Sequence, residues 1–213
     1  YDFPPFLRSA FHRLQNLEAN RLTAYWGHSL KSEKHYRVWW ELPKPSLMAV
    51  AGPLFNGASY YPFRAPQYGA VVSPIALDLL PRDSSTAIRN TGMHGISGVC
   101  FGKRGEFFTA HALPSDFVFT QEGQAFPLNN TRRSLLLLGF LNTPIVRYSL
   151  NRYTGQHKTS GYVNLLPYDE FSDPEKVIEL TRGALTQAAE LESLDELSPI
   201  FTNPPAWDTS LQH

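Results

Sequence analysis

The stretch SLLLLGFLNTPIVRYSLNRYTGQHKTSG, residues 134–161, changes from apolar to cationic within a few residues. Its first half predicts two helices that meet at Asn142–Thr143. Asn130 is a suitable N-cap for the first helix, and Thr143 followed by Pro144 is a suitable start for the second. The remainder, TGQHKTSG, predicts a loop, and GYVNLLPY at residues 161–168 predicts a short strand after it. We therefore expect the chain to leave a packed core here and to present this loop at the surface.

Upstream of this stretch, short aromatic and β-branched runs predict strands. They are YRVWWEL at residues 36–42, EFFTAHAL at 106–113 and DFVFTQE at 116–122. The last two alternate apolar and polar residues, as half-buried strands do. GKRG at 102–105 predicts a hairpin turn that either contacts phosphate or is simply solvated. The expected fold class is α+β, with a twisted, mainly antiparallel sheet, packed helices and an acidic C-terminal helix.

The two ends of the chain predict further helices. Apolar residues at three- and four-residue spacing indicate a helix over residues 5–21. Near the other end, Asp173 followed by Pro174 is typical of a helix start, here of a helix over 174–196. Its expected apolar face consists of Val177, Leu180, Ala184, Ala188 and Leu191. The predicted organisation is an N-terminal helical segment (1–30), an α+β domain (31–171), and an acidic C-terminal helix and tail (172–213).

The charge balance differs sharply between the two parts of the chain. Residues 1–160 hold 17 Lys and Arg against 9 Asp and Glu, whereas residues 161–213 hold 2 against 10. A basic body of this kind fits a polyanionic partner, and the acidic part would then face elsewhere. The simpler interpretation of the acidic part is a solvated helix face. Both interpretations stay open on the sequence alone.

Several classes of site are excluded by what the sequence lacks. A single cysteine, Cys100, permits no internal disulfide and favours a reducing, cytoplasmic compartment. No apolar run is long enough to cross a membrane, so no membrane partner is expected. The seven histidines show no metal-ligand spacing, and there is no P-loop and no GxSxG motif. We therefore expect no metal site and no catalytic residue in this chain.

Two ordered blocks carry a resemblance to a known family. They are HGISGVCFGKRGEFFTAHALPSDFVFTQEGQAFP at 94–127 and SLLLLGFLNTPIVRYSLNRYTGQHKTSGYVNLLPY at 134–168, preceded by YYPFRAPQYGAVV at 60–72. The second block resembles target-recognition domains of DNA adenine methyltransferases, in which a leucine-rich helix, Leu-Asn-Ser/Thr, a second helix, a loop and Leu-Pro follow in order. The combination resembles the large adenine-specific enzymes of bacterial BREX and DISARM phage-defence systems and of type IIG restriction–modification. The resemblance covers roughly residues 55–170.

The resemblance implies a sequence-specific duplex-DNA recognition module, which would make the 31–171 domain target-recognition-like. The implied parent protein is a methyltransferase that uses S-adenosylmethionine, with its catalytic domain upstream and other defence-system subunits as partners. TNPPAW at 202–207 departs from the family's Asn-Pro-Pro-Tyr/Phe motif at Ala206, and no glycine-rich cofactor loop precedes it. We therefore expect no cofactor and no catalysis in this chain. The alternative function is a protein-interaction module of a defence or restriction complex.

The candidate DNA-binding residues follow from side-chain chemistry within the resembling region. Cations on loops neutralise phosphates, and the candidates for this role are Lys103, Arg104, Arg152 and Lys158. Arginine, amide and imidazole groups contact base edges, and the candidates here are Arg89, Asn90, Gln156 and His157. A nuclease is not favoured, because no clustered carboxylates with a lysine occur in a strand setting.

Overall fold

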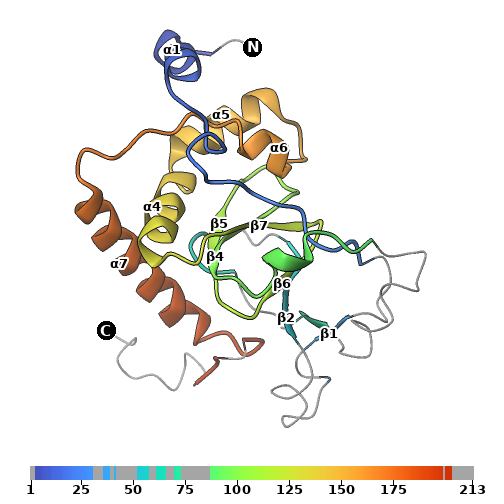
Figure 1. Cartoon of the computed structure of the whole chain (residues 1–213). Coiled ribbons are helices and arrows are strands. Elements are labelled where there is room, and N and C mark those ends of the chain that lie inside the picture. The colour runs from blue at the N-terminus through green and yellow to red at the C-terminus, as the bar shows by residue number, and fades with distance from the viewer. Residues whose placement is uncertain are drawn as a thin grey trace.

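The computed structural model describes residues 3–30, 36–38, 41, 52–57, 61–65, 70–72, 87–198 and 200–202. Within these residues, helices lie on one side of two small sheets (Figure 1). Several sequence predictions fall partly outside the described residues. They include residues 39, 40 and 42 of the first predicted strand, residues 60 and 66–69 of YYPFRAPQYGAVV, and all but the first residue of the TNPPAW motif.

The central sheet has β4 (Gly98–Gly102) between β5 (Ala110–Leu113) and β7 (Gly123–Pro127), with both pairings antiparallel. Successive residues of β4 point to opposite sides, and both sides are buried. Phe101 packs in the cluster that includes the α4 leucines, whereas Cys100 packs with Phe55 and Phe119. The prediction that the strand within 106–113 is only half-buried is therefore wrong. His111 is fully buried because the second sheet covers the side of β5 that we expected to face water.

The second sheet follows the order β1 (Tyr36–Val38), β3 (Ala70–Val72), β2 (Gly52–Phe55), β6 (Val118–Phe119). Its pairings are antiparallel except between β2 and β6, where Leu54 lies beside Val118 in a parallel arrangement. Because β6 leads directly into β7, the two sheets share one apolar layer. The predicted α+β class with a mainly antiparallel sheet is confirmed.

The two helices predicted at the opening stretch are confirmed as α4 (Thr131–Leu141) and α5 (Pro144–Tyr153). Asn130 caps α4, because its side-chain oxygen accepts a hydrogen bond from the Arg133 amide at 2.9 Å. The leucines of α4 seal the sheet, and Leu137 is fully buried. Figure 1 shows α4 lying between α7 and the strands β4 and β5.

The long C-terminal helix, α7 (Pro174–Glu192), begins where the sequence predicts, with the Asp173 carboxylate accepting from the Lys176 amide at 3.0 Å. It packs on α4 at Gly139, where an added Cβ would lie 2.7 Å from Thr181 Oγ1. The predicted apolar face is partly wrong, because Leu180 and Leu191 are exposed. Ile178 and Thr181 are buried in their place, since they face α4.

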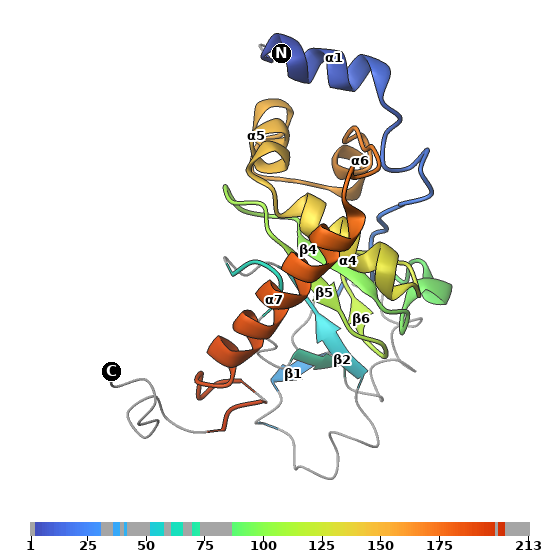
Figure 2. The same cartoon turned by 90° about the vertical axis from the view of Figure 1, so that its left-hand side faces the viewer.

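Two local predictions fail because distant segments compete for the chain. The N-terminal helix, α1 (Pro5–Arg13), ends well before residue 21, and the Leu17 amide donates instead to the Leu166 carbonyl at 3.0 Å. A strand was expected at 161–168, but the short helix α6 (Ser160–Val163) stands there and includes Gly161. The 3-10 helix η4 (Thr91–Met93) leads into β4. Figure 2 shows α1, α5 and α6 together at one end of the molecule.

Candidate nucleic-acid interface

The turn after β4 and the loop after α5 lie against each other and form one surface. The Lys158 amide donates to the Lys103 carbonyl at 2.7 Å, and the Gly105 amide donates to the Gln156 carbonyl at 3.2 Å. Arg104 and His157 are paired between these two bonds as an antiparallel bridge. Five of the eight predicted site residues therefore come together, although about fifty positions separate the two segments in the sequence.

Lys158 does not present its charge to solvent. The residue is only 2% exposed, and its Nζ donates to the Gly105 carbonyl at 2.7 Å and to the Gly155 carbonyl at 3.1 Å. Burial lowers the pKa of this amine below its usual value, while the nearby Glu106 acts in the opposite direction. The prediction that Lys158 is a surface cation available to phosphate is wrong, because the two carbonyls hold the amine inside.

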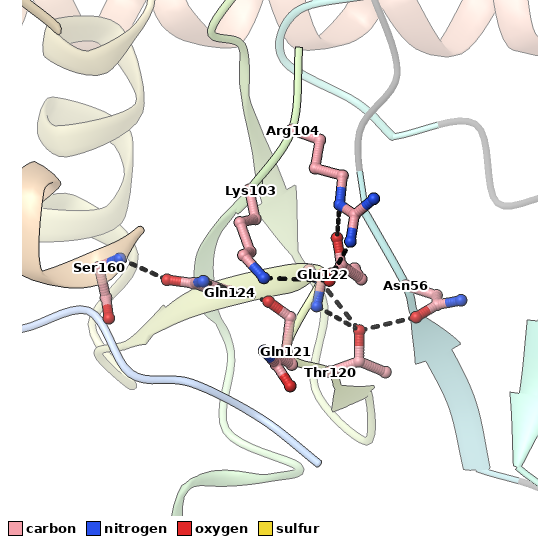
Figure 3. A network of polar contacts seen from close by, with 9 residues as sticks. Asn56, Lys103, Arg104, Thr120, Gln121, Glu122, Gln124 and Ser160 are labelled. Carbon is pink, nitrogen blue, oxygen red and sulfur yellow. Dashed lines mark hydrogen bonds and ion pairs between the residues drawn. The ribbon is translucent and has the colours of Figure 1, made fainter. Parts of the chain in front are cut away.

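Lys103 is likewise turned inward, toward a carboxylate that the sequence analysis did not single out. Glu122 lies 3.1 Å from Lys103 Nζ and 2.6 Å from Arg104 Nε, so one carboxylate holds both cations (Figure 3). Burial alone would raise the pKa of Glu122, but the hydrogen bonds and charges of Lys103 and Arg104 outweigh it and lower the pKa. Lys103 is therefore a buried ion-pair partner and not the open phosphate contact that we expected.

The exposed basic and amide side chains of this region are Arg104, Gln156 and His157, and Arg152 is exposed on the last turn of α5. We call these four residues the hairpin–loop surface. Glu106 on the hairpin is exposed as well. The Arg104 side chain is 66% exposed despite its bond to Glu122, so most of its guanidinium faces water. The Arg152 guanidinium lies 5.2 Å from the centre of the Tyr148 ring, which supports it in an extended position.

Arg147 and Phe107 belong near this surface and were not predicted as site residues. Phe107 follows the hairpin turn and is exposed, and the Arg147 guanidinium lies 5.8 Å from the centre of its ring. The two residues line a hollow of about 420 Å³ together with Phe63 and Asn142. The signal for Arg147 was its place in the cationic half of the opening stretch, but its partner Phe107 lies on the hairpin and only the fold brings them together.

Arg89 and Asn90 lie at a different place, beside the N-terminal segment. The Arg89 guanidinium is 5.6 Å from the centre of the Trp26 ring, and the Asn90 amide donates to the Trp26 carbonyl at 2.8 Å. Asn90 has a left-handed backbone with φ of 51°, which asparagine tolerates better than most residues. Both side chains are exposed. They would form a second contact region and not an extension of the hairpin–loop surface.

The charge around the hairpin–loop surface depends on the acidic and basic residues of the neighbouring segments. No aspartate or glutamate occurs from Gly123 to Tyr168, a stretch that holds Arg132, Arg133, Arg147, Arg152 and Lys158. On the hairpin side, Glu106 and Glu122 offset the charges of Lys103 and Arg104. On α4, Arg132 is paired with Glu175 of α7. The net positive charge of the region therefore comes mainly from Arg133, from α5 and from the loop that follows α5.

Other kinds of site find no support among the described residues. Within that part of the chain, no group of three or more His, Cys, Asp or Glu side chains is placed to hold a metal ion. Likewise, none of its helices is both long and apolar enough to cross a membrane. Comparison with models of known protein families and with curated protein sequences finds no match to this chain.

Proposed function

We propose that this chain is a sequence-specific duplex-DNA recognition module, the target-recognition part of an adenine-specific DNA methyltransferase. The observation that carries the proposal is the joining of the hairpin turn to the loop after α5. This joining gathers exposed arginine, amide and imidazole groups on one surface. The loop and α5 bring no acidic residue to it, whereas the hairpin carries Glu106 and Glu122. The resemblance of residues 94–127 and 134–168 to target-recognition domains supports the same function.

The four side chains divide by chemistry into two roles. Arg104 and Arg152 would neutralise backbone phosphates, which gives affinity without sequence information. Gln156 and His157 would contact base edges in a groove, where an amide pairs well with adenine. Arg89 and Asn90 would contact the duplex separately, beside Trp26 of the N-terminal segment. Lys103 and Lys158 are left out because their amines are buried.

The methyl transfer itself would belong to another part of the parent protein. S-adenosylmethionine would bind there, in an upstream catalytic domain, and this chain would position the duplex for it. Other subunits of a bacterial phage-defence or restriction complex would be further partners. A single cysteine, which is buried, fits the cytoplasm as the compartment.

The salt dependence of DNA binding tests this proposal. The chain should bind duplex DNA with an affinity that falls steeply as salt rises, because phosphate contacts release counterions. Arg104→Gln and Arg152→Gln should each lower the slope of log K against log salt by about 0.9. Glu190→Gln, an exposed change on α7, is the matched control and should leave the slope unchanged. Binding that is absent, or that does not depend on these two arginines, would refute the proposal.

A hollow beside α7 favours a second candidate function, docking of a protein partner. It measures about 510 Å³ and lies between α7 and residues 61–65, with the exposed Leu191 and Tyr61 on its wall. Residues 169–198 around it hold 9 Asp and Glu against 2 Lys and Arg. The fitting partner is therefore an apolar segment with basic flanks. Leu191→Asp should abolish capture of the parent complex's other subunits and leave DNA binding intact if this surface docks them.

A further inference from the structure

The loop that would read DNA has little regular structure of its own, so other segments must hold it in place. Thr154 to Thr159 connects α5 to α6, and both Gln156 and His157 are exposed within it. A loop of this kind would lose conformational freedom on binding, and that ordering cost would weaken both affinity and discrimination. The contacts that fix it are therefore the place to look for residues that control recognition.

Three contacts tie this loop to the central sheet. Two are the backbone bonds to the hairpin turn described above, and the third is a hydrogen bond from the Ser160 amide to the buried Gln124 side chain of β7 (Figure 3). Each of these fixes one backbone position. None of these three bonds comes from a single buried side chain that contacts both the hairpin turn and the loop.

The buried side chain of Lys158 contacts both the hairpin turn and the loop. Its Nζ joins the Gly105 carbonyl of the hairpin turn, at 2.7 Å, to the Gly155 carbonyl at the start of the loop, at 3.1 Å. We propose that Lys158 is a positioning residue: its buried ammonium fixes the hairpin turn and the loop as one rigid unit, so that Arg104, Gln156 and His157 meet DNA in a set geometry. This inference rests on the proposed function for its consequence, but the coupling itself is a property of the protein alone.

Gly105 supplies the acceptor of this contact on the hairpin turn. Its φ of 124° is a conformation that side chains other than glycine rarely adopt, and it presents the carbonyl that Lys158 binds. Hydrogen bonds to a charged donor are stronger than neutral ones, so their loss should loosen both segments together. A change at either residue should therefore produce the same effect.

Hydrogen exchange tests the coupling in the absence of DNA. In Lys158→Met, the amides of residues 103–107 and 154–159 should exchange about tenfold faster or more, while those of β4 and α4 stay protected. Gly105→Ala, which keeps the lysine but strains the other half of the contact, should accelerate the same amides, and it carries the test if Lys158→Met does not fold. Unchanged exchange in these segments would overturn the inference.

Binding measurements separate positioning from phosphate contact. Lys158→Met and Gly105→Ala should each lose about tenfold in preference for a cognate over a scrambled duplex. Lys158→Met should nevertheless keep the wild-type salt slope. Arg152→Met, the matched loss of an exposed cation, should lower that slope by about 0.9. A similar fall in slope for Lys158→Met, or full preference despite fast exchange, would refute the positioning role. If wild-type protein binds no duplex, the proposed function fails while the exchange result still decides the coupling.

Discussion

Asn142 binds the backbone of Ala110 twice, as a neighbouring strand would. Its Nδ2 donates to the Ala110 carbonyl at 3.0 Å, and its Oδ1 accepts from the Ala110 amide at 3.0 Å. The asparagine sits between α4 and α5, in the Leu-Asn-Thr element of the resemblance. Together with the Phe63 amide, which also donates to the Ala110 carbonyl at 2.9 Å, it satisfies the edge of β5 where that strand begins. The asparagine of this element therefore has a structural role in holding the start of β5.

Replacing Asn142 should destabilise the protein in a graded way. Asn142→Leu leaves the Ala110 amide without its partner, whereas the Ala110 carbonyl keeps the hydrogen bond from the Phe63 amide at 2.9 Å. We expect a loss of about 1–3 kcal/mol in unfolding free energy. Asn142→Asp keeps an acceptor for the amide and should cost less. Urea denaturation measures both variants. Equal stability of Asn142→Leu and wild type would show that these two bonds do not hold β5.

The apolar side of α4 gives the second stability prediction. Leu137 is fully buried, so Leu137→Ala should lower the unfolding free energy by about 2–5 kcal/mol through lost burial and a residual cavity. Leu180→Ala on α7 is the control, because that side chain is 61% exposed and should change stability by about 0.5 kcal/mol or less. Thermal melts in which the two variants behave alike would contradict the assigned core.

The features that the sequence predicted well depend on near neighbours. Asn130 and Asp173 cap helices through amides three residues away, and the leucines of α4 repeat within one helix. The failures depend on distant partners. Lys158 is buried because the Gly105 carbonyl, 53 residues earlier, accepts a hydrogen bond from its ammonium. Thr181 replaces Leu180 in the core because Gly139 leaves room for it. The site was found by residue type, but which cations stay exposed could be decided only in three dimensions.

Stability should fall as the pH is lowered from about 7 toward 5, before most carboxylates titrate. Burial lowers the pKa of His28 to about 4, with a smaller contribution from the charge of His94. Burial also lowers the pKa of His111 to about 4. Burial also lowers the pKa of His94. The unfolded chain, with a histidine pKa near 6.5, binds more protons between these values, so unfolding is favoured as pH falls.

Urea midpoints at pH 7.5, 6.5, 5.5 and 5.0 measure this effect. His111→Gln removes one of the three groups and should flatten the decline, even though it lowers stability at pH 7.5. A midpoint that stays constant or rises toward pH 5 would show that these histidines are not held in the neutral form.

Glu122 should limit the affinity of the hairpin for DNA while stabilising the fold. Its carboxylate pairs with both Lys103 and Arg104, so Glu122→Gln removes one negative charge from the proposed surface. We expect tighter duplex binding at low salt, together with a loss of about 1–3 kcal/mol in unfolding free energy as Lys103 loses its charged partner. Unchanged binding by a folded Glu122→Gln protein would place the hairpin away from the duplex.

Selection from a randomised duplex library tests the central claim most directly. Wild-type protein, or the parent protein that contains it, should enrich one short sequence motif over repeated rounds at fixed salt. The double variant Gln156→Ala/His157→Ala should still bind duplex DNA through its arginines but should lose or change that motif at some positions. Enrichment of no motif by the wild type, or of an unchanged motif by the double variant, would contradict recognition through the hairpin–loop surface.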